Sequence, residues 1–369
     1  MDKNPIAIDL FCGAGGLTEG LINAGFDVKL SIDSDPNSYF VYTWNHKNSP
    51  AIWNNIEEIK KIETPLRFLG ISKKQVSLIA GGPPCQGFSN ANRRTNTLNN
   101  SHNKMVKQYL RIVKEVQPPY IIIENVEGLR YFEGGKIYEK IINKLEKLDY
   151  TVKTQILDAA DYGVPQHRKR LFIVASAFDN FKWPSKTHGP DAAKPWVTVS
   201  DAIIGDLPSI KGGGIRESKY FSQSTSIYQR KIRRGTRVLY DHITSQSQED
   251  VKKRFSLIPQ GSNLRLINQN GLLPKKLKII INHNGVYRRL DPFKPSITIT
   301  NISRSLIIHP IENRILSLRE AARLQSFYDD YRFPGPISRM QQAIGNAVPP
   351  LLARAVGKQI IKQVRYGKK

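Results

Sequence analysis

A glycine-rich segment near the amino terminus and a cysteine beside two prolines are the residues of this chain best suited to chemistry. Ile6–Phe11 reads as a buried strand and runs into Cys12-Gly13-Ala14-Gly15-Gly16, a tight turn at a helix start. Glycine has no Cβ, so the backbone of such a turn approaches a bound ligand closely. A further strand, Val76–Ala80, leads to Pro83-Pro84-Cys85, which presents a thiol on a rigid loop. A small-molecule cradle next to a nucleophile predicts group transfer through a covalent intermediate.

Cys85 is the strongest single candidate for a catalytic nucleophile. A thiolate is a strong, soft nucleophile, and nearby positive charge lowers the pKa of a thiol. The alternative is a buried structural cysteine, but such residues sit within apolar runs. Cys85 instead lies between Pro84 and Gln86. Cys12 fits a small loop residue better than a nucleophile.

Two carboxylates follow other predicted strands. Asp33 ends the strand Val28–Ile32, where acidic residues often bind ribose hydroxyls. The alternative for Asp33 is a solvent-facing turn. Glu124 ends the strand that starts at Tyr120, and a desolvated carboxyl there has a raised pKa and can donate a proton. The alternative for Glu124 is a cap on the following turn. Because the carboxyl ends of parallel strands meet at one sheet edge, we expect these side chains to gather near Cys85.

The basic segment Gln166–Arg170 precedes one more strand, Leu171–Ala175. Alternate residues of a strand point the same way, so Arg168 and Arg170 are expected to project together into the cleft. Their planar guanidinium groups suit a base carbonyl or a phosphate. A solvated basic turn is the alternative.

Strand-like and helix-like segments alternate through the first half of the chain. Helical stretches such as Lys104–Val116 and Gly135–Leu148 separate the short apolar strands. This alternation predicts an α/β fold with a doubly wound, mostly parallel, Rossmann-like sheet. Near the carboxyl end, Ser317-Leu318-Arg319-Glu320 forms a capping box that opens a helix. A last amphipathic helix is expected from Leu351 to about Val364.

The charge of the chain points to a polyanionic partner. Among 369 residues, 56 are Lys or Arg and 31 are Asp or Glu, which gives a net charge of +25. Nucleic acid is the commonest polyanion, although a basic protein of unrelated function remains an alternative. Two cysteines cannot build a disulfide framework and fit a reducing cytoplasm. No signal peptide or bilayer-spanning apolar run is apparent, so a soluble intracellular protein is expected.

The character of the sequence changes near Asp179. Prolines, a run of three glycines and a higher density of positive charge follow. Residues 179–309 are therefore expected to form a smaller, irregular, strand-rich domain that faces nucleic acid, with a solvated insertion as the alternative. Residues 1–178 and 310–369 are expected to form the catalytic domain. Candidates for phosphate or guanine contact in the smaller domain are Arg233, Arg234, Arg237, Arg288 and Arg289.

Six segments, in this order along the chain, resemble the cytosine-C5 DNA methyltransferase family. They are Asp9–Gly16, Gly82–Ser89, Glu124-Asn125-Val126, Gln166–Arg170, Arg319–Phe327 and Gly345–Pro350. The resemblance covers about residues 1–178 and 310–369. It implies an S-adenosylmethionine-dependent methyltransferase domain and makes the middle of the chain the variable target-recognition domain.

The resemblance also implies a mechanism. Cys85 adds to C6 of cytosine, Glu124 assists at N3 and Arg170 binds O2, with Arg168 beside it. C5 then receives the methyl group of S-adenosylmethionine, and loss of the C5 proton and of the cysteine restores the aromatic ring. Because C6 is inaccessible in a stacked duplex, the base must flip out of the helix.

Further site residues follow from the match to the family. Those expected at the cofactor are Phe11, Gly13, Gly15, Gly16, Leu17, Asp33, Ile56, Pro84 and Asn346. Those expected at DNA, besides the five arginines above, are Gln86, Ser89, Arg93, Arg94, Thr298 and Ile299. No metal is expected.

The family points to a bacterial or phage modification enzyme that acts in the cytoplasm on double-stranded DNA. We expect a monomer that shares its site with a restriction endonuclease without stable contact. Two alternatives stay open: a tRNA cytosine-5 methyltransferase and a non-catalytic DNA-binding regulator with the same fold. The tRNA enzymes tend to carry a Cys-Phe-Thr segment and a smaller central region, and this chain has neither. Intact Cys85, Glu124 and Arg170 argue against the regulator. A nicotinamide oxidoreductase is a distant third, because the glycine spacing does not suit it.

Overall fold

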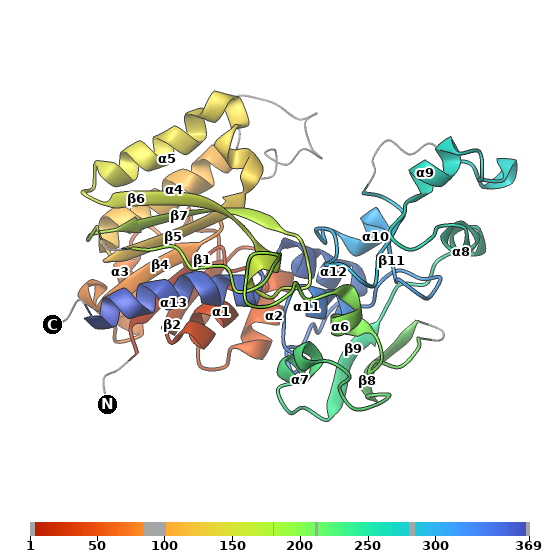
Figure 1. The fold of residues 1–369 in the computed structure, drawn as a ribbon. Coiled ribbons are helices and arrows are strands. Elements are labelled where there is room, and N and C mark those ends of the chain that lie inside the picture. Colours follow the sequence, from red (N-terminus) through yellow and green to blue (C-terminus); the bar gives the residue numbers. More distant parts are fainter. Residues whose placement is uncertain (1–3, 85–100, 180, 211–212, 280–284, 367–369) are drawn as a thin grey trace. The chain divides into compact units, whose positions relative to one another are not determined.

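The structure is a computed structural model that describes residues 4–84, 101–179, 181–210, 213–279 and 285–366 (Figure 1). The chain divides into two compact units. The first contains Met1–Asp158, Lys169–Ser185 and Val348–Lys369. The second contains Ala159–Arg168 and Lys186–Ala347. Within the described residues, no helix is long and apolar enough to cross a membrane.

The first unit is built on one seven-stranded sheet with the strand order β3-β2-β1-β4-β5-β7-β6. All neighbours are parallel except β7, which runs antiparallel to β5 and β6. The strands are β1 (Ile6–Leu10), β2 (Asp27–Asp33), β3 (Ala51–Trp53), β4 (Val76–Gly81), β5 (Tyr120–Val126), β6 (Thr151–Asp158) and β7 (Lys169–Ser176). The expected doubly wound, mostly parallel sheet is confirmed.

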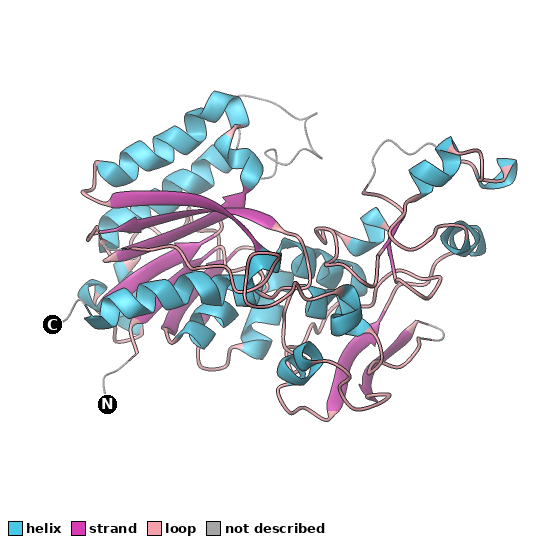
Figure 2. Ribbon diagram, viewed as in Figure 1, coloured by secondary structure: helices cyan, strands magenta, loops and turns pink. Residues whose placement is uncertain are grey.

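Helices cover both faces of this sheet (Figure 2). One face carries α3, α4 and α5, whose apolar residues share a single buried cluster with the strands. On the other face α1 packs against α13. Gly20 permits this approach, because a Cβ there would lie 2.3 Å from that of Ala353. The helices are α1 (Gly16–Ala24), α2 (Pro36–Asn45), α3 (Glu63–Phe68), α4 (Ser101–Val116), α5 (Lys136–Glu146) and α13 (Pro350–Tyr366).

The central strands are apolar because they are covered on both sides. In β5 the residues from Tyr120 to Asn125 are all buried, and β1 is buried from Ala7 to Leu10. Parallel strands covered on both faces read as continuous apolar runs rather than as alternating ones. Polar residues such as Asp9 and Glu124 therefore stand out in these strands.

The second unit consists mainly of short helices with two small sheets. Its sheets pair β8 (Gly214–Lys219) antiparallel with β9 (Val238–Ile243), and β10 (Arg288–Arg289) parallel with β11 (Ile307–Ile308). Its helices are α6 (Val199–Ile203), α7 (Ile227–Arg233), α8 (Glu249–Ser256), α9 (Leu264–Gln269), α10 (Ile302–Ser305), α11 (Leu318–Leu324) and α12 (Ile337–Asn346).

The boundary between the units differs from the one expected from composition. Residues 159–168 and 310–347 group with the second unit. The reason is packing: α11 contacts α6 and β9, and the side chain of Gln166 donates a hydrogen bond to the carbonyl oxygen of Leu324 at 3.1 Å. Segments that carry the family resemblance, such as Arg319–Phe327, thus belong to the second unit.

Candidate active site

The glycine-rich turn after β1 has an unusual backbone. Phe11 has a φ of 62°, and its N–H donates to the carbonyl oxygen of Ile32 at 2.8 Å. Gly13 and Gly15 have φ values of 54° and 82°, in the region that favours glycine. Gly15 is the residue before α1, and a Cβ on Gly13 would meet no atom within 4 Å. The turn therefore leaves an open face at the start of a helix.

Asp33 links this turn to the end of β2. One carboxylate oxygen accepts the N–H of Gly13 at 2.7 Å, and the other accepts the N–H of Asp35 at 2.8 Å. Burial raises the pKa of Asp33 above its ordinary value. A carboxylate at a strand end beside an open glycine turn fits a ligand that carries hydroxyl groups, so these residues suit the ribose of a nucleoside cofactor.

The other residues expected at the cofactor differ in burial and are divided between the two units. Gly16 begins α1, and Leu17 and Ile56 are buried, with 4% and 3% of their surface exposed. Pro84 is exposed, and Asn346 ends α12 in the second unit, where it accepts a hydrogen bond from Gln342 at 2.7 Å. Their contacts with a cofactor stay predictions.

A second carboxylate lies beneath the turn. Oδ2 of Asp9 accepts the hydroxyl of Thr18 at 2.6 Å, whereas Oδ1 makes no hydrogen bond within the described part of the chain. Burial raises the pKa of Asp9 to about 7. Burial, with the charge of Asp33, also raises the pKa of the Cys12 thiol well above its ordinary value. Cys12 is thus a neutral thiol, which fits the small loop residue expected.

An ion pair lies at the edge of the sheet from which the chain continues toward Cys85, here called the reactive edge. Oε1 of Glu124 in β5 lies 3.0 Å from Nε of Arg170 in β7, and about a tenth of each side chain is exposed. Gly82, just after β4, adjoins the same carboxylate: a Cβ on it would lie 3.1 Å from Oε2 of Glu124. The edge thus combines an acid, a planar cation and the strand that leads to Cys85.

Asn125 fixes the start of the segment that carries the cysteine. Its side-chain amide donates to the carbonyl oxygen of Pro83 at 3.2 Å. Pro83 is buried, two residues before Cys85. No separate role was predicted for Asn125, and the only indication of one in the sequence is its position directly after Glu124. Five predicted site residues lie outside the described residues: Cys85, Gln86, Ser89, Arg93 and Arg94.

Arg168, expected beside Arg170 in the site, has its guanidinium bound to backbone carbonyls. Its side chain is 1% exposed, and its guanidinium donates to the carbonyl oxygens of Ile299, Gly345 and Ala347 at 2.8 to 3.0 Å. All of these partners belong to the second unit. Arg168 therefore links separate segments of that unit, and its expected role beside Arg170 stays a prediction.

The pair Thr298 and Ile299 is held by the same segment. The hydroxyl of Thr298 donates to the carbonyl oxygen of His167 at 2.8 Å. The N–H of Ile299 donates to the side chain of Gln166 at 2.8 Å, and Ile299 is 0% exposed. The side chain of Ile299 is thus packed inside the second unit, and its contact with DNA stays a prediction. Thr298 is half-buried, and its contact stays a prediction.

Two of the five arginine candidates, Arg289 and Arg233, have little exposed surface and several partners inside the second unit. Arg289 is 4% exposed, and its guanidinium donates to four backbone carbonyls and to the side chain of Asn313. Arg233 pairs with Asp206 at 3.0 Å and stacks on Tyr220. Both guanidinium groups are engaged inside the unit, and their contacts with DNA stay predictions.

The other three arginines keep an accessible surface. Arg237 is exposed, and Arg288 is half-buried in β10. Arg234 stacks on Tyr328 and lies 3.7 Å from Asp330, with 42% of its side chain exposed. Their contacts with DNA stay predictions.

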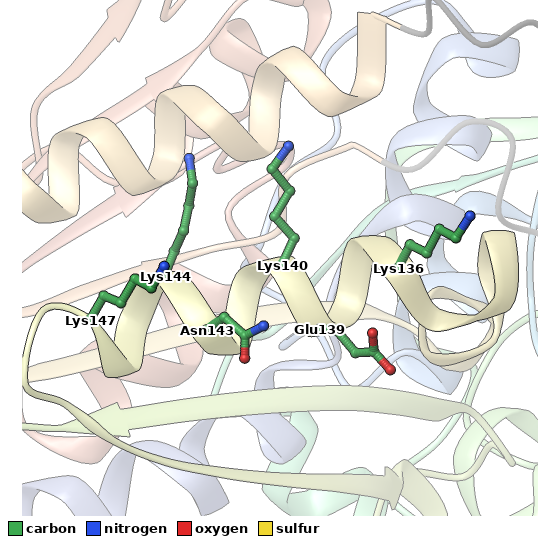
Figure 3. Close-up of a pocket in the computed structure, with 6 residues that line it drawn as sticks. All are labelled: Lys136, Glu139, Lys140, Asn143, Lys144 and Lys147. Atoms are coloured by element: carbon green, nitrogen blue, oxygen red, sulfur yellow. The ribbon is translucent and has the colours of Figure 1, made fainter.

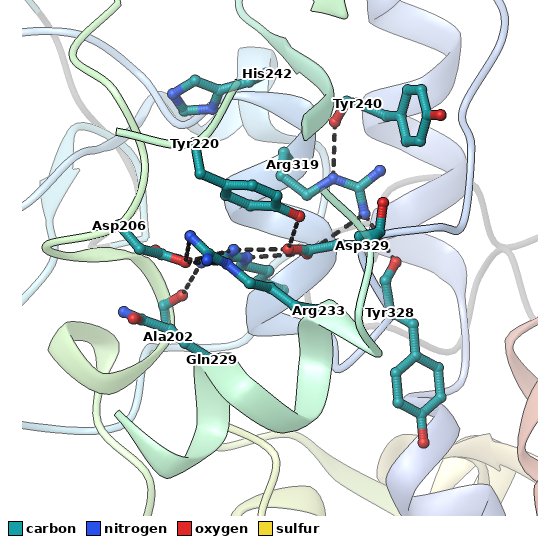
Figure 4. A network of polar contacts seen from close by, with 12 residues as sticks. Ala202, Asp206, Tyr220, Gln229, Arg233, Tyr240, His242, Arg319, Tyr328 and Asp329 are labelled. Carbon is teal, nitrogen blue, oxygen red and sulfur yellow. Dashed lines mark hydrogen bonds and ion pairs between the residues drawn. The ribbon is translucent and has the colours of Figure 1, made fainter. Parts of the chain in front are cut away.

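A buried charge network in the second unit escaped the sequence analysis (Figure 4). Arg323 in α11 is fully buried and forms ion pairs with Asp206 at 2.7 Å and with Asp329 at 2.6 Å. The hydroxyl of Tyr220 donates to Asp329 at 2.7 Å. The network links Arg323 of α11 to Asp206, which lies in the proline- and glycine-rich region that follows Asp179. The helix was predicted, but no local pattern reveals that Asp206, 117 residues before Arg323, is its partner.

Comparison with known proteins identifies the family of this chain. The family model described as C-5 cytosine-specific DNA methylase matches residues 6–362. Type II methyltransferase M1.HphI of Haemophilus parahaemolyticus is 33% identical over 96% of this chain and 86% of its own length. Type II methyltransferase M.AgeI of Thalassovita gelatinovora is 32% identical over 96% of this chain and 98% of its own.

A solved structure supports the fold. The crystal structure of a DNA modification methyltransferase encoded within an E. coli prophage superposes with a TM-score of 0.79. The two chains are 24% identical, and the match covers 98% of this chain and 99% of the other. Similarity of this kind establishes the same architecture for both chains.

Proposed function

The chain belongs to the C-5 cytosine-specific DNA methylase family, and from this premise we propose that it methylates C5 of a flipped-out cytosine within a short duplex sequence. The proposed methyl donor is S-adenosylmethionine. We further propose that the enzyme is the modification half of a bacterial restriction-modification system, because the relatives above are named Type II methyltransferases. It then works in the cytoplasm as a monomer, without stable contact with the endonuclease.

The glycine turn and Asp33 fit the proposed donor. The open face at Gly13 leaves room for a ligand close to the backbone, and Asp33 presents oxygens that accept hydroxyl hydrogens. When bound, S-adenosylmethionine supplies an electrophilic methyl group. The N-terminal end of α1 faces the same turn through Gly15.

The placement of Glu124 and Arg170 beside the strand that leads to Cys85 is the observation that carries the proposal. The Cys85 thiolate forms a bond to C6, and the ring electrons move toward C5 and N3. Glu124 hydrogen-bonds or protonates N3, while the planar donors of Arg170 hold the O2 carbonyl. After C5 is methylated, loss of its proton breaks the bond to sulfur and restores the ring.

The test is methyl transfer from labelled S-adenosylmethionine to plasmid DNA, followed by bisulfite sequencing. Protected cytosines within one recurring short sequence support the proposal. Transfer to bulk tRNA instead of DNA identifies the RNA enzyme. Absence of transfer to either, with DNA binding retained, identifies a non-catalytic regulator.

A further inference from the structure

One face of α5 carries a row of lysines that the proposed reaction does not use. Lys136, Lys140 and Lys144 are spaced four residues apart, and Lys147 follows directly after the helix. A helix has about 3.6 residues per turn and rises about 1.5 Å per residue, so the four share one side over about 16 Å. All four are exposed.

These lysines are not paired with acidic residues in the part of the chain that the structure describes. None of the four forms an ion pair with any residue that the structure describes. Together with Glu139 and Asn143 they line a shallow hollow of about 400 Å³ (Figure 3). Lys140 and Lys144 extend from α5 toward α4, which packs beside it. An anion that enters the hollow meets four ammonium groups and a single carboxylate, that of Glu139.

The helix that presents the lysines is firmly held. Its opposite side buries Ile137, Ile141 and Leu145 in the core cluster, with at most 5% of each residue exposed. That cluster belongs to the sheet face covered by α3, α4 and α5, whereas α1 and α13 pack together on the other face. The lysine row is therefore a separate surface with a fixed spacing.

We propose that the lysine face of α5 binds the phosphate backbone of a second segment of duplex DNA, separate from the segment at the reactive edge. This proposal rests on DNA being the substrate. Steps of four residues place cations about 6 Å apart along the helix, which suits a regular polyanion. Every exposed residue from Lys136 to Lys147 is polar. A protein partner would require an apolar centre, which this face lacks.

The first test measures the salt dependence of binding to a non-cognate duplex. The test variant replaces Lys136, Lys140, Lys144 and Lys147 with Gln. A matched control removes the same charge from exposed lysines of the same unit outside α5, at Lys60, Lys61, Lys74 and Lys358. Each lost phosphate contact lowers the slope of log K against log salt by about 0.9, so we expect a decrease of about 2 to 4 for the test variant and less than about 1 for the control. Equal decreases in the two variants overturn the proposal, because only the overall charge then matters.

The second test compares short and long substrates. Methylation of a short duplex that carries the target site should be equal in wild type and the α5 variant, while methylation of the site within plasmid DNA should be several-fold slower in the variant. Equal loss on both substrates overturns the proposal, since the lysines then contact the segment at the reactive edge. Methyl transfer by the wild type tests the proposed function separately. The salt slope still tests the lysine face if no transfer occurs.

Discussion

Oε1 of Glu124 in β5 and Nε of Arg170 in β7 lie 3.0 Å apart, although α5 and β6 separate the two strands along the chain. The register explains the contact. Glu124 is opposite Phe172, and Arg170 is opposite Val126, so the two are diagonal neighbours two positions apart on antiparallel strands. Side chains at such positions lie on the same face of a sheet and within reach of each other. Strand β7 therefore brings the cation to the acid.

Replacing Glu124 with Gln is expected to slow the methyl-transfer step by about 100- to 10,000-fold, the range typical of a lost acid–base catalyst. The amide keeps the shape but cannot supply a proton. The measurement is single-turnover methylation at saturating cofactor and DNA. Glu127→Gln, in the turn just after β5, is the matched control and should retain the wild-type rate. A wild-type rate for the Glu124 variant excludes the acid role.

Replacing Cys85 with Ala is expected to abolish turnover while DNA binding persists, because only the bond to C6 is lost. Gel-shift and methylation assays on the same preparation check both. Normal methylation by this variant refutes the nucleophile assignment.

The two cysteines should also differ toward iodoacetamide. We expect Cys85 to be alkylated first and Cys12 to be spared, since Cys12 is buried and its thiol pKa is raised. Mass spectrometry of the native protein distinguishes them.

Replacing Asp33 with Ala is expected to weaken cofactor binding by at least about tenfold, equivalent to about 1.4 kcal/mol. Two hydrogen bonds that hold the turn are lost along with the predicted ribose contact. Calorimetric titration with S-adenosylhomocysteine measures the change. Asp35→Ala is the control: it removes the cap of α2, at a cost of about 1 kcal/mol in stability, but no predicted ligand contact. Equal effects on affinity contradict a direct role for Asp33.

The pKa of Asp9 predicts an unusual pH dependence of stability. The pKa is raised from 3.8 to about 7 in the folded protein, so the folded state binds more protons than the unfolded state between these pH values. The free energy of unfolding contributed by Asp9 therefore falls as the pH rises from about 4 to about 7. Asp9→Asn should remove this dependence, because its amide oxygen still accepts from Thr18 and its other atom carries no charge. Urea unfolding at pH 5 and pH 8 measures it, and an unchanged pH dependence in the variant contradicts the assignment.

The sequence predicted most of the first unit because its signals are local. The strands that contain Ile8, Ile79 and Ile122 are apolar runs closed by turns, and the helix of Lys104–Val116 was placed in agreement with α4. The edge strands β3 and β6 were missed, because they are short or only partly buried and carry mixed residues.

Side-chain direction was less predictable than strand position. Arg168 and Arg170 were expected to point the same way from one strand. Arg168 instead precedes β7, and its guanidinium donates to carbonyl oxygens far away in the sequence, such as that of Ile299. A buried arginine and a DNA-contacting arginine look alike until the carbonyls around them are known. The same holds for Arg289, whose acceptors come from two separate segments, Phe255 to Ile258 and His309 to Asn313.

Loss of Arg323 is expected to destabilise the second unit more than any single exposed change. Arg323→Ala removes the nearest counter-charge of the buried Asp206 and Asp329, which keep Arg233 at 3.0 Å and Arg319 at 3.9 Å, respectively. Removal of one partner from a buried ion pair costs about 3 to 5 kcal/mol. Arg304→Ala, an exposed residue of α10, should stay within about 0.5 kcal/mol of wild type. Chemical unfolding monitored by tryptophan fluorescence compares them. If the first variant does not fold, Asp329→Asn provides a milder test, because it keeps the shape and halves the counter-charge. A small effect in both Arg323 and Asp329 variants means that the network contributes little net stability, as buried ion pairs sometimes do when desolvation offsets their attraction.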